Sequence, residues 1–311
     1  MPSFIQRLKD SKPVLLAAPM CGYTRFPFRQ ILSSFPVDLV FTEMASIDAI
    51  HYNNPNTRPI LYHEKIGIPA GVQLVGRKIP YFLEAVRKLS PSGLYEVFDI
   101  NMGCPVKKVL KSGGGSALIE NPDLVHQIMT TLTHEFPDLF FSAKIRIGIN
   151  SLNLNYKEIS KAVEEGGAKM LTVHGRTRAQ VYSGNVDLEA IRIIKETVKI
   201  PVIGNGGIFT PEDAKKMLDE THCDGVMPAR GMFGNPWLFR EIKEYLTAGQ
   251  YQKPSLEDKI QTFQKHFFLE SHFDPENGYR EYKKIGIGYL SGFKKASELR
   301  KSLIECKTTE Q

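Results

Sequence analysis

Short apolar runs alternate along this chain with longer stretches in which apolar positions recur every three or four residues. Eight such runs lie at residues 14–18, 39–42, 71–75, 97–100, 140–147, 170–173, 202–204 and 225–227. Runs that are apolar throughout are typical of parallel strands covered on both faces. The stretches between most of them, such as 78–89 and 121–136, have the period of a helix. Strands and helices that alternate in this way predict an α/β fold.

The helical stretches also carry start signals. Asn121-Pro122 combines a capping residue with a proline at the first helical position, and Thr210-Pro211 precedes two acidic residues in the same manner. Eight strand–helix units in about 245 residues fit a (β/α)8 TIM barrel, whose usual size is ~250 residues. A doubly wound open sheet is the alternative, but it would be unusually long and regular.

The pattern changes at a polar connector that contains glycine and proline, near residues 247–254. Beyond it, residues 255–273 and 281–304 have the pattern of amphipathic helices, and no further strand is predicted. We therefore expect a TIM barrel at residues 1–247 and a small all-helical domain at 248–311.

Composition adds limits to this picture. The 311 residues are 42% hydrophobic and 24% charged, as in ordinary globular proteins. No stretch approaches the ~18 consecutive apolar residues of a membrane span, and the first residues lack the apolar segment of a secretion signal. The four cysteines, at positions 21, 104, 223 and 306, form no paired spacing that would indicate disulfides or zinc. We expect a reduced, cytoplasmic protein without a membrane or metal partner.

The formal net charge of +6 is mild, but basic residues gather near the C-terminus. Between residues 279 and 301 the basic residues are Arg280, Lys283, Lys284, Lys294, Lys295, Arg300 and Lys301, against Glu281 and Glu298. Such a cluster suits a polyanionic partner. On charge alone, a solvated helical face is the favoured interpretation.

A single cysteine marks the end of the fourth apolar run. Cys104 lies on the turn Gly103-Cys104-Pro105, and Lys107 and Lys108 follow closely. A cysteine on a strand-exit turn beside cations has the setting of a reactive thiol, whereas most buried cysteines are inert. This stretch alone leaves both interpretations open. The active sites of TIM barrels, however, form at the carboxyl ends of the strands, where this cysteine is placed.

Two further features near the strand ends narrow the class of ligand that the site could bind. Glycines follow both the seventh run, in Asn205-Gly206-Gly207, and the eighth, in Ala229-Arg230-Gly231. These glycines could form ordinary turns or the phosphate site that barrels build at this place. Their position after two consecutive strands favours the phosphate site. Lys144 lies within a buried strand, which is costly unless it has a carboxylate partner or faces a ligand.

His174 follows the sixth run and has two possible chemical roles. No second histidine or carboxylate stands at the spacing of a zinc site, so we predict no metal. A Cys104–His174 nucleophilic pair would make the protein a hydrolase or transferase, but nothing else in the chain requires it.

With these residues assembled, the chain resembles the tRNA-dihydrouridine synthase family of FMN-dependent enzymes. The resemblance extends over nearly the whole chain, and its most specific part is the motif from Asp99 to Val109 around Cys104. The other matching motifs are Ala17-Ala18-Pro19-Met20, Thr42-Glu43-Met44, Val72-Gln73, Lys144-Ile145-Arg146, Val173-His174-Gly175-Arg176-Thr177-Arg178, Ile203-Gly204-Asn205-Gly206 and Ala229-Arg230-Gly231.

The resemblance implies that FMN is the cofactor and that NADPH, or NADH, reduces it. It also implies the residues that hold the flavin. Pro19, Met20 and Cys21 would lie along the ring, Gln73 and Lys144 at its polar edge, His174 at the ring or the phosphate, and Asn205, Gly206, Gly207, Ala229 and Arg230 around the phosphate.

The implied reaction reduces specific uridines of tRNA to 5,6-dihydrouridine. Reduced FMN delivers hydride to C6 of uracil and Cys104 donates a proton to C5, while Asn101 positions the base. The target nucleotide has to leave its stack. Arg176, Arg280, Lys283 and Lys284 would bind the tRNA, and we expect a monomer. The alternatives are an FMN barrel dehydrogenase of free dihydropyrimidines and a non-catalytic tRNA-binding barrel.

This chain departs from the family pattern at three positions. Gly207 stands where many members have aspartate, Cys21 where a small residue such as alanine is common, and Pro228 precedes Ala229. None of these changes removes a group that the reaction needs. Because glycine has no side chain, residue 207 cannot make a side-chain contact of the kind an aspartate could make.

Overall fold

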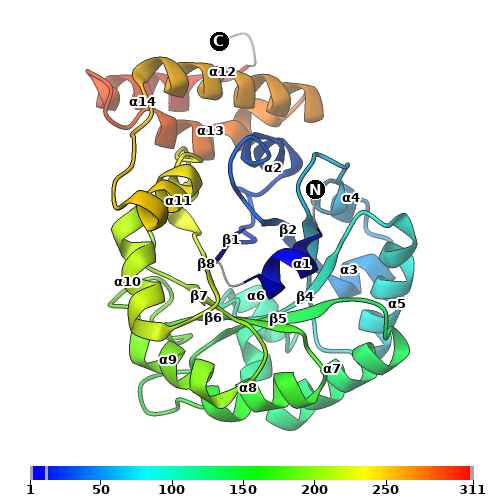
Figure 1. Ribbon diagram of the computed structural model, residues 1–311. Coiled ribbons are helices and arrows are strands. Elements are labelled where there is room, and N and C mark those ends of the chain that lie inside the picture. Colours follow the sequence, from blue (N-terminus) through cyan, green and yellow to red (C-terminus); the bar gives the residue numbers. More distant parts are fainter. Residues whose placement is uncertain (1–2, 11–12, 309–311) are drawn as a thin grey trace.

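In the computed structural model, which describes residues 3–10 and 13–308, all eight predicted strands form and close into a barrel (Figure 1). Each strand pairs with its neighbour in chain order, β8 pairs with β1, and every pairing is parallel. The TIM barrel is confirmed and the open sheet is excluded. The strands are β1 (Val14–Ala17), β2 (Leu39–Ser46), β3 (Ala70–Val75), β4 (Val97–Met102), β5 (Phe141–Arg146), β6 (Met170–His174), β7 (Val202–Asn205) and β8 (Gly225–Met227).

Helices surround the barrel, and the capping signals act as expected. The side chain of Asn121 accepts a hydrogen bond from Leu124 N, and Thr210 forms a reciprocal capping pair with Asp213. The longer surrounding helices are α2 (Phe26–Leu32), α5 (Ile79–Leu89), α7 (Pro122–Glu135), α8 (Tyr156–Glu165), α9 (Leu188–Thr197), α10 (Pro211–Thr221) and α11 (Leu238–Ala248). Shorter helices are α3 (Ile47–His51), α4 (Arg58–Leu61) and α6 (Lys107–Lys111), with 3₁₀ turns η1 (Pro55–Thr57), η2 (Ser90–Ser92), η3 (Gly115–Glu120) and η4 (Arg230–Met232).

The first helix, α1 (Phe4–Lys9), covers the amino-terminal end of the barrel (Figure 1). The fully buried Phe4 packs on Phe140, which directly precedes β5, and Phe4 N donates to Glu96, which directly precedes β4. Phe4 also belongs to the apolar cluster inside the barrel, together with Leu16 and Phe41. This end of the barrel is therefore closed, and the carboxyl ends of the strands form the other end.

The C-terminal part is helical, with α12 (Leu256–Phe273), α13 (Gly278–Tyr289) and α14 (Ala296–Glu305). The prediction of one continuous helix over 281–304 is wrong, because α13 ends at Tyr289 and α14 begins at Ala296. Between them Gly292 and Lys295 have φ angles of 85° and 61°. These left-handed conformations interrupt an α-helix.

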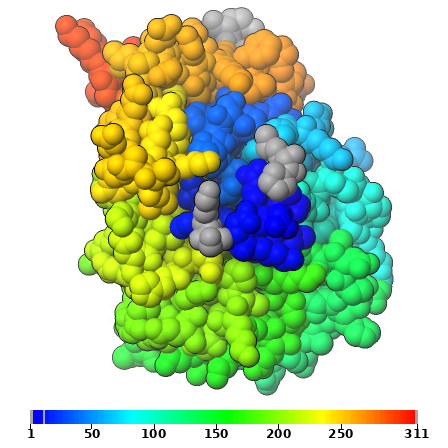
Figure 2. Space-filling view, viewed as in Figure 1, coloured from blue at the N-terminus to red at the C-terminus, as the bar shows by residue number. Residues whose placement is uncertain are grey.

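Helices α12 and α13 pack closely against the barrel part. Ile285 and Tyr289 belong to the same apolar cluster as the barrel's outer face, and Arg25 forms ion pairs with Glu270 and Asp274 at 3.2 and 3.1 Å. In Figure 2 the orange surface of the C-terminal helices is continuous with the blue surface of the N-terminal part. Within the described residues, no helix has the length and apolar character to cross a membrane.

Candidate active site

A cavity of about 300 Å³ lies at the carboxyl ends of the strands. Among the residues that line it are ten of those predicted from the sequence: Pro19, Met20, Cys21, Gln73, Asn101, Cys104, Lys144, His174, Asn205 and Ala229. A smaller pocket shares His174, Asn205 and Ala229 with the cavity and adds Arg176, Gly206, Gly207 and Arg230. The fold thus brings every predicted site residue of the barrel into two adjoining hollows.

The turn that carries Cys104 is held from both sides. Oδ1 of Asn101 accepts hydrogen bonds from Gly103 N at 3.2 Å and Cys104 N at 2.9 Å. The carbonyl of Cys104 accepts from the amide and hydroxyl of Ser116, at 3.0 and 2.9 Å. Nε of Arg146 donates to the carbonyl of Gly103 at 2.8 Å. The backbone of the cysteine is therefore fixed at the cavity wall.

The environment of Cys104 favours the protonated form of its thiol. Burial raises its pKa, and the charge of Arg146 opposes this shift less strongly. Burial, with a contribution from Glu43, also raises the pKa of Cys21 to about 11. Both cavity cysteines are therefore protonated at neutral pH, which suits Cys104 to give up a proton rather than to attack as a thiolate.

Lys144 reaches the cavity from β5. Its Nζ donates to Oδ1 of Asn205 at 2.7 Å, and Nδ2 of Asn205 donates to the carbonyl of Met227 at 2.6 Å. Burial lowers the pKa of Lys144 to about 7, and the nearby charge of Arg146 adds to this shift. The partner of the ammonium is thus an amide and not a carboxylate, so a positive charge here favours an anionic ligand.

A row of hydrogen bonds leads from Asn101 into the barrel. Nδ2 of Asn101 donates to Oε1 of Gln73 at 2.7 Å, and Nε2 of Gln73 donates to Asp99 at 2.7 Å. The hydroxyl of Ser142 donates to the other oxygen of Asp99 at 2.6 Å. Sequence reasoning missed Asp99 and Ser142 as supporting residues. The available signal was an acidic residue inside an apolar strand run.

The smaller pocket has the features of a phosphate site. Gly206 and Gly207 have φ angles of 110° and 71°, and a Cβ on Gly206 would lie 2.7 Å from the ring of His174. The guanidinium of Arg230 lies over the rings of Tyr182 and Phe209, 4.7 and 5.5 Å from their centroids. Glycine backbone beside a cation fits a phosphate monoester such as that of FMN.

Two predicted residues in this pocket are tightly held. Burial, with Lys144 and neighbouring arginines, lowers the pKa of His174 well below its ordinary value, so its ring is neutral. The guanidinium of Arg176 donates to the carbonyls of Ser183 and Gly184 and is mostly buried. The structure therefore places Arg176 in the smaller pocket, and its contact with tRNA stays a prediction.

The predicted basic residues of α13 line neither hollow. Nζ of Lys283 donates to the carbonyls of Ile304 and Cys306, at the end of α14. Lys284 is exposed and pairs with Glu281 at 2.5 Å, and it lies beside Gly22 in the loop after β1. Arg280 is exposed and bonds to the hydroxyl of Tyr279. Lys284 therefore approaches the rim of the cavity, while Lys283 supports α14.

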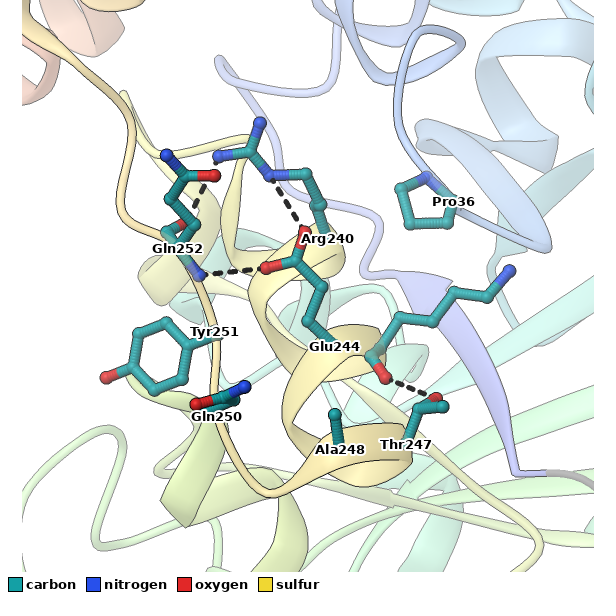
Figure 3. A pocket seen from close by; sticks show the side chains of 9 residues that line it. Pro36, Arg240, Glu244, Thr247, Ala248, Gln250, Tyr251 and Gln252 are labelled. Carbon is teal, nitrogen blue, oxygen red and sulfur yellow. Dashed lines mark hydrogen bonds and ion pairs between the residues drawn. The ribbon is translucent and has the colours of Figure 1, made fainter.

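A larger, open pocket of about 650 Å³ lies away from these residues, beside α11 and the connector (Figure 3). Arg240 pairs with Glu244, which in turn accepts from Gln252 N at 2.9 Å. The charged side chains of this pocket thus hold the connector on α11. None of the predicted site residues lines the pocket. Across residues 3–10 and 13–308, no group of three His, Cys, Asp or Glu is arranged to bind a metal.

Comparison with known proteins agrees with this site. The family model of dihydrouridine synthase (Dus) matches residues 15–311. tRNA-dihydrouridine synthase B of Pseudomonas aeruginosa is 35% identical over 288 residues, which are 92% of this chain and 86% of the relative. tRNA-dihydrouridine synthase B of Escherichia coli is 37% identical over 279 residues, 89% of this chain and 86% of the relative.

A third relative, "Probable tRNA-dihydrouridine synthase 1" of Synechocystis, is 34% identical over 301 residues, 96% of this chain and 83% of its own. The chain belongs to the dihydrouridine synthase family. Enzymes of this family are flavin-dependent oxidoreductases.

Proposed function

We propose that this oxidoreductase, which converts uridines of tRNA to 5,6-dihydrouridine, carries FMN in the barrel cavity and takes its electrons from NADPH. The family match and the names of the relatives support the reaction. The glycine-lined pocket with Arg230 supports a flavin that ends in a phosphate monoester. Gln73 and Lys144 lie in the adjoining cavity, where they would face the polar edge of its ring.

The chemistry divides between cofactor and protein. Bound FMN supplies, in its reduced form, the hydride that uracil C6 receives. Cys104 donates its thiol proton to C5, so that the C5–C6 double bond gains one hydride and one proton. The charge of Arg146 stabilises the thiolate that remains until solvent returns the proton. Asn101 holds the backbone of Cys104 and would also orient the base.

The observation that carries this assignment is the shared position of Cys104 and Lys144. Both line one cavity. Lys144 lies on β5, and Cys104 lies on the turn that follows β4, the strand whose Asn101 pairs with Lys144. A protonated thiol and a buried cation meet the two needs of the reaction: a proton for carbon and stabilisation of negative charge.

We propose that residues 1–247 provide flavin binding and chemistry, and that residues 248–311 bind tRNA. Arg280 and Lys284 are exposed on α13, and Lys284 lies beside the loop after β1. Cations on this face would contact backbone phosphates, with Lys283 and Arg176 as further predicted contacts. We also propose that the protein acts as a monomer in the cytoplasm.

The test is dihydrouridine formation in tRNA from a strain that lacks this protein. Purified protein, FMN and NADPH are added to this tRNA, and dihydrouridine is mapped position by position. We expect it to appear at particular sites that carry none in the starting tRNA. Free uracil is the matched substrate control. Turnover of uracil without modification of tRNA would favour a dehydrogenase of free dihydropyrimidines, and tRNA binding without turnover would favour a binding protein.

A further inference from the structure

Polar side chains cross three neighbouring strands inside the barrel, beneath the floor of the cavity. The register pairs Gln73 of β3 with Asp99 of β4, and Asp99 with Ser142 of β5. Because alternate residues of a strand face the same side, Asp99 lies one layer deeper than Asn101. Its side chain is buried, and the barrel interior around it is otherwise largely apolar. A buried carboxylate costs free energy of folding unless hydrogen bonds or an opposite charge compensate it.

The hydrogen bonds in this row have one self-consistent direction. The backbone N–H of Cys104 only donates, so Asn101 must turn Oδ1 toward it and Nδ2 toward Gln73. Gln73 must therefore present Oε1 to Asn101 and Nε2 to residue 99. This row of hydrogen bonds is complete only if residue 99 accepts the hydrogen bond from Gln73. An ionised carboxylate can only accept, because it carries no hydrogen to donate.

We propose that Asp99 is a positioning residue that sets the amide orientations of Gln73 and Asn101 and, through Asn101, the turn that carries Cys104. This inference rests on the proposed function, in which Gln73 binds the flavin edge and Cys104 donates the proton. One buried carboxylate would then couple the two halves of the site. Replacement by asparagine keeps the shape but offers a donor as well as an acceptor, which permits the amide of Gln73 to turn over.

The electrostatic surroundings of Asp99 agree with this role. Burial raises its pKa to about 6, while the hydrogen bonds from Gln73 and Ser142 and the charge of Lys144 oppose the shift. The carboxyl is therefore mostly ionised at neutral pH. Ser142 donates to the oxygen that Gln73 does not use, so both oxygens have partners.

The test is a double-mutant cycle with Asp99→Asn and Gln73→Ala, with two readouts that need no tRNA. One is the FMN dissociation constant, measured by flavin fluorescence on reconstitution of flavin-stripped protein. The other is the rate at which iodoacetamide labels Cys104, followed by mass spectrometry of its peptide. We expect Asp99→Asn alone to weaken FMN about tenfold and to change the labelling rate severalfold. In the Gln73→Ala background it should change neither further.

Ser160→Ala is the matched control, because Ser160 is also buried and loses a hydrogen bond, to the carbonyl of Lys157, but lies on α8 outside this row. FMN affinity should stay within about twofold of wild type. Additive effects in the cycle would show that Asp99 supports the fold without acting through Gln73, and would overturn the inference. An unchanged FMN affinity in Asp99→Asn would do the same.

A polarity swap keeps the inference testable even if Asp99→Asn folds poorly. In the pair Gln73→Glu with Asp99→Asn, the new carboxylate accepts from both neighbours. The bond between residues 73 and 99 reverses, but Asn101 still donates to residue 73 and keeps its oxygen on the turn of Cys104. The labelling rate of Cys104 should return to within about twofold of wild type. Absence of this rescue contradicts the inference. Failure of the wild type to bind FMN or to modify tRNA would instead contradict the proposed function, since labelling of Cys104 requires neither.

Discussion

Nζ of Lys144 lies 2.7 Å from Oδ1 of Asn205, so a cation on β5 is held across the barrel mouth by an amide on β7. The same amide donates to the carbonyl of Met227 on β8. The ammonium is therefore oriented without being neutralised. This arrangement costs stability in the free protein and leaves a positive charge for a ligand.

Lys144→Met should stabilise the flavin-free protein and weaken its function. Removal of the desolvated ammonium is expected to add about 1–2 kcal/mol to the free energy of unfolding at neutral pH, measured by denaturant titration. Dihydrouridine formation should fall at least tenfold, because the site loses its charge stabilisation. Lys215→Met, which alters an exposed pair with Asp219, should leave both quantities almost unchanged.

The sign of the pH dependence follows from the lowered pKa of Lys144. Between about pH 7 and the ordinary lysine pKa of 10.5, the unfolded chain binds the proton and the folded chain has released it. Stability therefore rises with pH in this window, and Lys144→Met removes that slope. Parallel pH profiles for wild type and variant would contradict a buried, depressed lysine.

Cys104→Ala should separate the two halves of the reaction. Flavin binding and its reduction by NADPH should remain, whereas dihydrouridine formation should fall by about 100-fold or more, because the proton donor is lost. Flavin absorbance and dihydrouridine content measure the two halves. Cys306→Ala, outside the cavity, is the control for loss of a thiol. Wild-type rates in Cys104→Ala would reject the general-acid role.

The half-reaction of the reduced enzyme with tRNA should depend on pH through the thiol. Burial raises the pKa of Cys104, and the protonated form is the active one. The rate should therefore be level through neutral pH and fall about tenfold per unit above that raised pKa. Stopped-flow oxidation of the flavin measures it. A rate that increases as the thiol ionises would indicate a nucleophilic thiolate instead.

Gly206→Ala should weaken flavin binding. Its φ is 110°, and the new Cβ would lie 2.7 Å from the ring of His174 in the phosphate pocket. We expect at least a tenfold rise in the FMN dissociation constant, since the backbone and the ring must separate. Gly93→Ala also has a positive φ, 62°, but meets no atom within 4 Å. It should lose stability without losing flavin affinity.

Arg29→Ala should destabilise the protein strongly. Arg29 is fully buried and donates to the carbonyls of Thr24 and Tyr62, which fixes two loops near the cavity. Loss of these bonds and the resulting void should cost about 3–4 kcal/mol, measured by denaturant unfolding. Arg192→Ala, which removes an exposed pair with Glu189, should cost less than about 1 kcal/mol. Similar costs for the two variants would contradict this contrast.

The barrel and the membership of its active site could be predicted from sequence because both follow from local patterns. Apolar runs of strand length alternate with helical periods, and parallel strands bring their carboxyl ends to one edge. Gln73 and Lys144 lie in the carboxyl-terminal halves of their strands and Cys104 follows β4, so their place along the chain was enough to bring them together.

The interactions among these residues were decided only by the tertiary structure. Whether Gln73 meets Asp99 depends on the register between β3 and β4, and the protonation of Cys104 and Lys144 depends on burial by distant segments. The break between α13 and α14 likewise accompanies the packing of Tyr289 into the barrel's outer core. The sequence by itself determined which strands form and what stands at their ends, because these follow from short-range periodicity. Hydrogen-bond partners and proton affinities depend on contacts between residues far apart in the chain, so only the folded molecule decides them.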